Sequence, residues 1–174
     1  MKLLETLARD AARYRALGGI RRNLGFWMGA THRLATYARS APALVRAPLL
    51  VTCRSANLLW RTVWGVDLAE EARIGPGLCL IHPRDVHVGP CQIGDDLLIF
   101  HEVTIAGEGR GLRIGHGVDV YVGARVLGDV SVGDHAKIGA NCAVRTDVEP
   151  GSDVVPARNR VIPAALVAAF GPRH

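Results

Sequence analysis

His82 stands beside Pro83 in the stretch LCLIHPRD (residues 78–85), which otherwise alternates aliphatic residues with small and turn-forming ones. Imidazole titrates near neutral pH, so a histidine here could take the proton of an alcohol, which is a poor nucleophile at that pH. His82 and His87 also have an H-x4-H spacing, which zinc sites can use. A third interpretation is that His82 fills a turn with its ring in solvent.

A repeat of six residues runs through the part of the chain that contains His82. It starts at Leu68, with one extra residue at Val86 and one nine-residue unit at 105–113. Of its 14 leading positions, 12 are Leu, Ile or Val, although these three types make up only 47 of the 174 residues. A period of six fits neither a helix nor a simple alternating strand, but it fits a solenoid in which each unit is one short strand and a turn.

Three such units would form one triangular coil, with the leading aliphatic residue pointing inward and a following glycine at the corner. We therefore predict a parallel β-helix of about five coils over residues 66–156. His101 fills in IFHEVT the slot that His82 fills in LIHPRD, 19 residues earlier, which is one coil of 18 plus the single extra residue. The two histidines should stack on one face.

Residues 1–65 have a different composition, with 11 Lys and Arg, two acids and only five of the twenty glycines. Apolar residues recur there at helical spacing, which predicts an N-terminal α-helical region of about three helices, broken near Gly18 and Gly19 and around 40–42. Residues 157–174 are expected to form a C-terminal tail with a short helix at 164–170. Without aromatic interleaving or a nucleic-acid motif, the N-terminal arginines indicate a solvated helical bundle and no nucleic-acid partner.

The four cysteines form no CxxC pair, which indicates reduced thiols in a cytoplasmic protein. Neither a signal peptide nor a spanning helix is expected, because charges occur throughout the first turns and arginines interrupt the most apolar N-terminal segment. A peripheral basic helix on an anionic membrane stays open, and it would suit a lipid-linked acceptor.

Four stretches, GVDLAEEARIGPGLCLIH, EVTIAGEG, GARVLGDVSVGDHAKIGANCAV and VPAR, resemble the serine acetyltransferase family of hexapeptide-repeat acyltransferases. The resemblance covers about residues 10–158. It implies left-handed coils, which periodicity alone cannot show, and an acetyl-CoA-dependent O-acetyltransferase without a metal. The stretches APLLV and FHEVTIAG and the chain length favour the short members of colanic-acid-type exopolysaccharide pathways.

The resemblance gives His82 the role of catalytic base. It would take the proton of the acceptor hydroxyl as the oxygen attacks the acetyl-CoA thioester, while backbone N–H groups stabilise the oxyanion. The chain departs from the family pattern at three places. Ile81 stands where the serine enzymes have Asp, the short loop after VTIAGEG offers Arg110 in place of a second histidine, and Val154 replaces a glycine.

The resemblance also suggests residues that bind the two substrates. Asp10 corresponds to an acceptor-binding aspartate, the alternative being an ordinary helix-surface residue. Lys137 corresponds to a lysine near the CoA phosphates, where arginines could serve the same anion. The remaining expected residues are Asp85, His101, Glu102 and Arg110 for the acceptor, and Arg145, Ala157 and Arg158 for acetyl-CoA.

Family members bind acetyl-CoA between neighbouring coil domains, so we expect a homotrimer, and the helical region could pair two trimers. Ile81 and the short loop make the acceptor pocket less charged than free serine requires. We therefore favour a sugar or similar polar hydroxyl compound over the alternative, L-serine O-acetylation in cysteine biosynthesis. Two other classes stay open: a non-catalytic scaffold, and a zinc enzyme of the γ-carbonic anhydrase type, which lacks a first histidine because His32 lies in the helical part.

Overall fold

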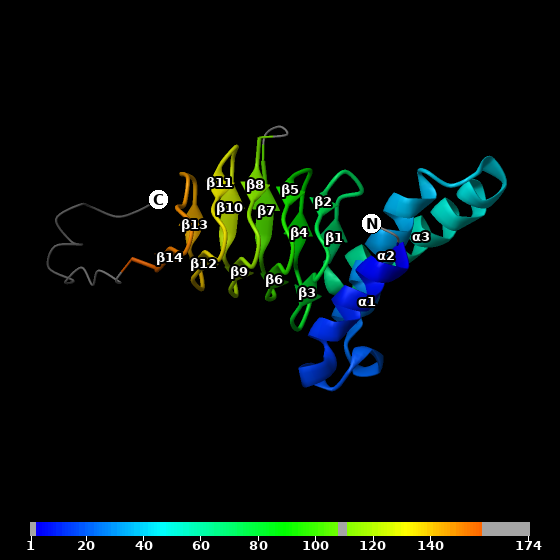
Figure 1. Ribbon diagram of the computed structural model, residues 1–174, viewed down its shortest axis with the longest axis horizontal. Helices are drawn as coiled ribbons and strands as arrows, with labels where there is room; N and C mark the ends of the chain where they lie inside the picture. The colour runs from blue at the N-terminus through cyan, green and yellow to red at the C-terminus, as the bar shows by residue number, and fades with distance from the viewer. Residues whose placement is uncertain (1–2, 108–110, 158–174) are drawn as a thin grey trace, which may run out of the picture.

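The computed structural model describes residues 3–107 and 111–157, and it places a helical region at one end of an elongated β-solenoid (Figure 1). Within these residues, 14 short strands form three parallel sheets whose strands lie side by side from coil to coil. This is the left-handed parallel β-helix that the six-residue repeat and the resemblance predict. The expected helix at 164–170 lies outside the described residues.

Three helices form the N-terminal region: α1 (Leu3–Arg13), α2 (Leu24–Ala38) and α3 (Ala43–Trp64). Two 3-10 turns, Arg15–Leu17 and Ile20–Arg22, connect α1 to α2. Gly18 and Gly19 separate these turns, and both have a positive φ that glycine adopts without steric cost. Pro42 caps the start of α3. The breaks therefore occur where the sequence placed them.

The strands follow one another around the coils, and the three sheets have the orders β1-β4-β7-β10-β13, β11-β8-β5-β2 and β14-β12-β9-β6-β3. Four coils are complete, and β13, a bridge at Val148 and β14 make a fifth. The strands are β1 (Asp67–Leu68), β2 (Arg73–Ile74), β3 (Cys79–Leu80), β4 (His87–Val88), β5 (Gln92–Ile93), β6 (Leu98–Ile99), β7 (Thr104–Ala106), β8 (Arg113–Ile114), β9 (Asp119–Val120), β10 (Arg125–Leu127), β11 (Ser131–Val132), β12 (Lys137–Ile138), β13 (Ala143–Val144) and β14 (Asp153–Val154).

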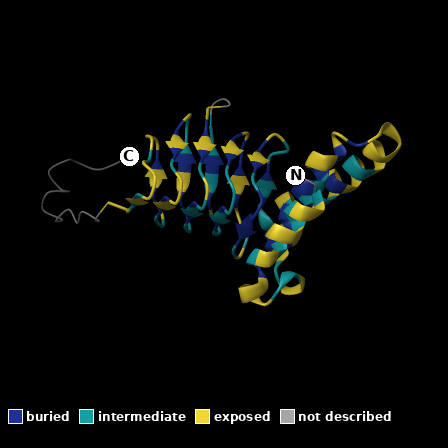
Figure 2. Cartoon of the chain, in the orientation of Figure 1, coloured by how far each residue is buried: buried dark blue, intermediate teal, exposed yellow. Residues whose placement is uncertain are grey.

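The core of the solenoid consists of the aliphatic residue that each strand directs inward. Val88, Ile99 and Val126 are completely buried, and they belong to one continuous hydrophobic cluster that runs through all coils. Burial of each such side chain stabilises the fold by about 1.5–3 kcal/mol. In Figure 2 buried and exposed residues alternate along the strands, as this arrangement requires.

The structure corrects the frame of the repeat at two places. His87 points outward and Val88 points inward, so the fourth unit begins one residue later than predicted. In the last coil, Val148 rather than Pro150 pairs with the coil before it, through a bridge to Val132. His87 and Pro150 are the two leading positions without an aliphatic residue. In the structure Val88 and Val148 take these positions, so every unit does have an aliphatic residue there.

Side chains of α1 and of the turn that follows it cover the free edge of β3, which is the last strand of its sheet. The Asp10 carboxylate accepts hydrogen bonds from the N–H groups of Gly77 and Leu78, at 2.7 and 3.0 Å. The Tyr14 hydroxyl accepts one from the Leu80 N–H at 2.8 Å. These backbone groups would be unsatisfied without the helix, and an unsatisfied buried group costs about 1–3 kcal/mol.

Arg33 of α2 completes this cover. Its guanidinium donates to the backbone carbonyls of Ile74 and Gly75, and its Nε lies 3.0 Å from an oxygen of Asp10. The two charged side chains are almost completely buried, so each one neutralises the other. The helical region thus binds the backbone of the first coil where a preceding coil would otherwise lie.

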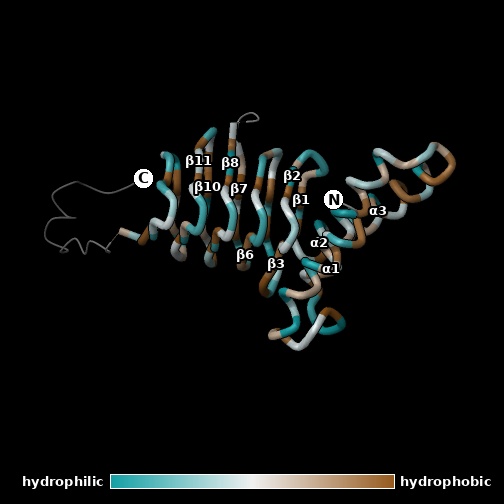
Figure 3. The backbone as a smooth tube through the Cα atoms, viewed as in Figure 1, coloured by the Kyte–Doolittle hydropathy of each residue, from teal (hydrophilic) through white to brown (hydrophobic). Residues whose placement is uncertain are grey.

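The outward side of α3 carries several exposed apolar residues, among them Leu44, Val51 and Leu58. Figure 3 shows hydrophobic segments along this helix, away from the solenoid. No helix in the described ranges is long and apolar enough to cross a membrane.

Candidate active site

His82 lies at the corner between β3 and β4, in the first coil. This corner is longer than its counterparts: residues 81–85 separate the inward Leu80 from the inward Val86, whereas residues 100–102 span the same corner in the next coil. His82 has a φ of 49°, in the left-handed region, and its side chain is exposed. A loop that leaves the regular coil therefore carries the imidazole outward.

The hydrogen bonds between coils show which residues are inserted. The N–H of Ile81 donates to the carbonyl of Ile99, and the N–H of Glu102 donates to the carbonyl of Arg84. The first coil thus matches the second up to residue 81 and again from residue 84. His82 and Pro83 are the extra pair, and the single extra residue predicted at Val86 is wrong, since Val86 has an ordinary inward position.

His101 lies in register with Arg84, because the coil resumes its register there. The prediction that His101 stacks on His82 is therefore wrong in register, since the insertion shifts the corner by two residues. The Nδ1 atom of His101 lies 3.4 Å from a carboxylate oxygen of Glu102, and both side chains are partly exposed. His101 and Glu102 form one polar pair at the corner of the second coil.

An apolar column that the sequence analysis did not identify runs beside this corner. Ile81, Phe100 and Tyr121 occupy equivalent ladder positions in the first three coils. The rings of Phe100 and Tyr121 are stacked, with centroids 5.3 Å apart and an interplanar angle of 17°. All three side chains are half-buried. The aromatic residue in second place in the units IFHEVT and VYVGAR is the signal that could have revealed the stack.

Asp10 does not lie at a surface, so the helix-surface alternative is wrong. Its side chain is buried, and both oxygens are already bonded, one to Arg33 and the other to Arg33 and two backbone N–H groups. The carboxylate is therefore engaged within its own chain, and its expected role in binding the acceptor stays a prediction. In the described chain, Asp10 joins the helices to the first coil.

Asp85 and Glu102 hold the same position in consecutive coils, and both have a positive φ, of 52° and 59°. Both side chains are exposed. Asp85 lies against the helical region, because its N–H donates to the carbonyl of Trp64 at 2.9 Å and its carboxylate covers Gly65. Arg110 lies outside the described residues.

The residues expected to bind acetyl-CoA are spread over the last two coils. Lys137 is exposed on the outward side of β12, and it lies in register between Asp119 and Asp153. Arg145 and Ala157 are exposed, and Arg158 lies outside the described residues. A phosphate near Lys137 would therefore meet two carboxylates as well as the ammonium group.

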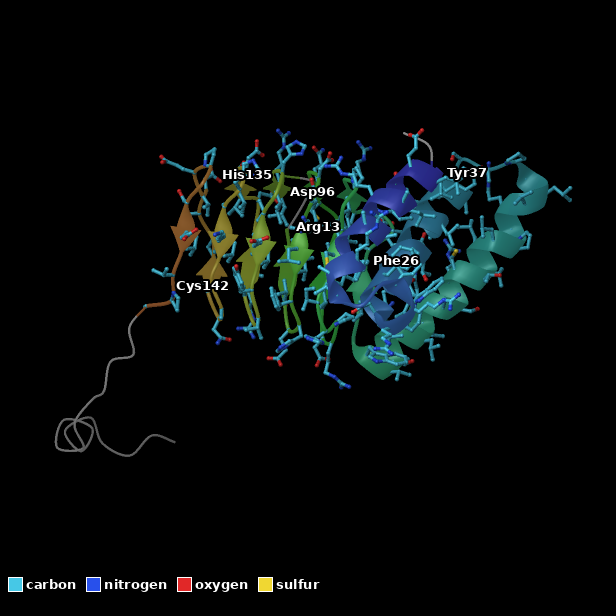
Figure 4. All side chains as sticks on the ribbon, turned by 60° about the horizontal axis from the view of Figure 1, so that its bottom comes forward. Arg13, Phe26, Tyr37, Asp96, His135 and Cys142 are labelled. Atoms are coloured by element: carbon cyan, nitrogen blue, oxygen red, sulfur yellow. The ribbon has the colours of Figure 1, made fainter. Side chains whose placement is uncertain are left out.

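Four cavities of the described chain, of about 430–640 Å³, have walls that do not include His82. One of about 640 Å³ opens between the end of α2 and the first corner, where Arg39 pairs with Glu70. Burial raises the pKa of the Cys91 thiol in its wall to about 12, which makes that thiol a poor nucleophile. Another, of about 430 Å³, lies beside α1 and includes Arg13, Asp96 and His135, which Figure 4 shows close together.

His87, the second member of the H-x4-H pair, lies on β4 with its Nδ1 3.6 Å from a carboxylate oxygen of Asp67. Among the described residues, no group of three or more His, Cys, Asp or Glu side chains is placed to hold a metal ion. The geometry of the described chain thus gives no support to the zinc alternative.

Comparison with known proteins identifies the family, although no family model matches the chain. Serine acetyltransferase of Helicobacter pylori (strain ATCC 700392 / 26695) is 39% identical over 137 residues, which cover 75% of this chain and 80% of that protein. Serine acetyltransferase of Mycobacterium tuberculosis is 34% identical over 149 residues, covering 81% of this chain and 62% of that protein.

Solved structures agree with these relatives. A structure of Neisseria gonorrhoeae serine acetyltransferase in complex with serine matches with a TM-score of 0.68 and 27% identity, covering 89% of this chain and 67% of that one. A serine acetyltransferase in complex with CoA matches with a TM-score of 0.71 and 25% identity, covering 90% and 68%. The chain therefore belongs to the serine acetyltransferase family and is an acetyl-CoA-dependent O-acetyltransferase of that type.

Proposed function

We propose that the protein transfers the acetyl group of acetyl-CoA to the hydroxyl of L-serine, with His82 as general base. The observation that carries this proposal is the 39% identity to a protein named serine acetyltransferase, over 80% of that protein's length. The matching structure with bound serine supports the same acceptor.

The site supplies a base that is free to react. His82 is exposed, at a corner that projects from the coil, and its φ of 49° directs the chain away from the ladder. His82 accepts the proton of the serine hydroxyl while that oxygen forms a bond to the acetyl carbonyl carbon. The C–S bond then breaks, and the sulfur leaves as the CoA thiol after taking up the proton from His82.

The comparisons favour L-serine over the sugar hydroxyl that the sequence analysis preferred. That preference depended on Ile81, which replaces an aspartate, and on the short loop, which lacks the family's second histidine. The Asp10 carboxylate, which is also expected to bind the acceptor, is bonded to Arg33 and to the first coil of its own chain. A sugar acceptor therefore stays as the competing outcome of the test.

We propose that the working enzyme is a homotrimer whose sites are shared between copies. In the single chain, neither His82 nor His101 lines the cavities near the helices. A neighbouring solenoid would supply the second wall and exclude water from the reaction. Light scattering at micromolar concentration should give three times the chain mass, or six times if the helical regions pair two trimers, and a monomer would contradict the shared site.

The test is an acceptor screen that follows CoA thiol release from acetyl-CoA. L-serine, homoserine, free sugars, nucleotide sugars and lipid-linked sugars are compared at equal concentration, with the His82→Ala variant as the blank for each. We expect rapid, saturable release with L-serine, and a rate about 10²- to 10⁴-fold lower with the variant. Saturable release with a sugar and none with L-serine would overturn the proposed acceptor, whereas full activity in the variant would overturn the role of His82.

A further inference from the structure

We propose that Tyr14 is a positioning residue for His82 and that it acts through the backbone of Leu80. This inference rests on the proposed role of His82 as general base. Tyr14 belongs to the turn that follows α1, 68 positions before His82 in the sequence, so that only the fold brings the two regions together.

The Tyr14 hydroxyl holds the end of β3. It accepts a hydrogen bond from the Leu80 N–H at 2.8 Å, on the side of β3 that has no neighbouring strand. The side chain is 1% exposed and its ring packs edge-on against Phe26, with centroids 6.0 Å apart. Gly25 lies on the same side of β3, because a Cβ at that position would collide with the Leu80 carbonyl and come to 3.0 Å from the Tyr14 hydroxyl.

The chain runs from this fixed point directly into the catalytic loop. Ile81 is the last residue in register, with its N–H bonded to the Ile99 carbonyl, and it packs against the cluster that contains Tyr14. The register resumes only at Arg84. Among the described residues no backbone hydrogen bond holds His82 itself. The place from which the imidazole projects is therefore set by the two anchored ends of the loop.

Loss of the hydroxyl would leave the Leu80 N–H buried without an acceptor, and the end of β3 would shift or admit water to satisfy it. The imidazole would still be present, but at a changed distance from the acceptor hydroxyl. Small displacements of a catalytic group can reduce the rate about 100-fold. An effect through position should lower kcat while leaving the binding of acetyl-CoA intact.

The first experiment compares Tyr14→Phe with Tyr37→Phe. Tyr37 lies near the far end of α2 with 48% of its surface exposed, well separated from Phe26 in Figure 4. With acetyl-CoA and L-serine we expect Tyr14→Phe to lower kcat about 10- to 100-fold per CoA-binding site, with the KM for acetyl-CoA unchanged. Tyr37→Phe should match the wild type. An unchanged kcat per site in Tyr14→Phe would overturn the inference.

The double variant separates positioning from a general loss of structure. If Tyr14 acts only through His82, then Tyr14→Phe combined with His82→Ala should be no slower than His82→Ala alone. Further loss in the double variant would show that Tyr14 acts elsewhere. If His82→Ala itself keeps the wild-type rate, the proposed function fails, and this outcome is distinct from a failure of Tyr14→Phe alone.

A second pair of variants tests the same point if Tyr14→Phe does not fold. Gly25→Ala places a methyl group against the Leu80 carbonyl, whereas Gly29→Ala, one turn along α2, places it 3.4 Å from a Leu78 methyl. Only Gly25→Ala should lower kcat. The imidazole NMR signal of His82, assigned by its loss in His82→Ala, gives a reading that needs no acceptor. It should shift in Gly25→Ala and Tyr14→Phe, and an unshifted signal would contradict the proposal.

Discussion

The first coil and the coils behind it share one backbone pattern. They differ in what bonds to the edges of their strands and in the length of the corner at His82. In the second to fourth coils the strands have a neighbouring coil on both sides, and the corner that corresponds to the one at His82 takes three residues. The first coil has its free edge bonded to side chains of α1 and α2, and its corner extends by His82 and Pro83. Regularity provides the core, and the candidate catalytic group lies where regularity is interrupted.

The difference also shows how an interrupted corner can be tolerated. Arg33 bonds to the backbone at the end of β2, and Asp10 and Tyr14 fix the start and end of β3, with hydrogen bonds that the repeat itself cannot provide. A two-residue loop can then project without loosening the strand that leads into it. The helical region and the loop that carries His82 should therefore be considered as one structural unit.

Removal of the insertion is expected to have the largest effect. Deletion of His82 and Pro83 would give the first coil the corner of the second, and Asp85 already has the positive φ that Glu102 has. We expect acetyl transfer to fall about 10²- to 10⁴-fold, as for loss of a general base, with the melting temperature maintained. His82→Ala should give the same rate. A deletion variant that unfolds, or that keeps its activity, would contradict this account of the corner.

Breaking the buried ion pair should have the next largest effect, this time on stability. Arg33→Ala leaves the Asp10 carboxylate buried without its cation, which costs about 3–5 kcal/mol in the free energy of unfolding. Arg39→Ala removes an exposed pair with Glu70 and should cost at most about 1 kcal/mol. Urea unfolding of both variants makes the comparison, and equal losses would show that burial of the pair is unimportant.

Acid should weaken the contact between α2 and the first coil through His32. Burial lowers the pKa of His32 to about 4, and Arg33 adds to this effect. The ordinary pKa is 6.5, so the folded state binds fewer protons, and its stability is full above about pH 6.5 and falls as the pH drops toward 4. The loss should approach roughly 3 kcal/mol. Melting curves of the wild type and of His32→Leu, measured between pH 6.5 and pH 4, test this. The melting temperature of the variant should lack the part of the fall with pH that His32 causes.

The smallest effect is expected in the fourth coil, far from the insertion. Lys137→Ala should raise the KM for acetyl-CoA about tenfold with kcat unchanged, as for the loss of one charge-assisted hydrogen bond. Arg113→Ala, on the outward side of a different sheet, is the matched control. An unchanged KM in Lys137→Ala would show that Lys137 does not bind acetyl-CoA. Its charge would then serve only the neighbouring carboxylates of Asp119 and Asp153.

The sequence predicted the solenoid well because its core obeys a simple rule, an inward aliphatic residue at every turn of the chain. It failed at His87 because counting in sixes cannot detect a two-residue insertion followed by a shorter corner at 89–90. A finer signal was present: Val86 and Val88 form the same spaced pair as Val103 and Ile105, with one outward residue between them.

The role of Asp10 could not be predicted in the same way. Its carboxylate bonds to backbone N–H groups 67 and 68 positions away, and backbone groups leave no pattern in the sequence. The same holds for Tyr14 and Leu80. A resemblance can transfer the position of a residue such as Asp10, but its function depends on which edge of the sheet is left unpaired.

The cover that α1 and α2 form over the first coil binds main-chain atoms for the most part, and so it places few demands on the coils that follow. The number of coils is therefore separable from the junction and from the corner that carries His82. Coils of 18 residues could be added over evolutionary time or by design, while the junction, the His82 corner and Lys137 are inherited unaltered.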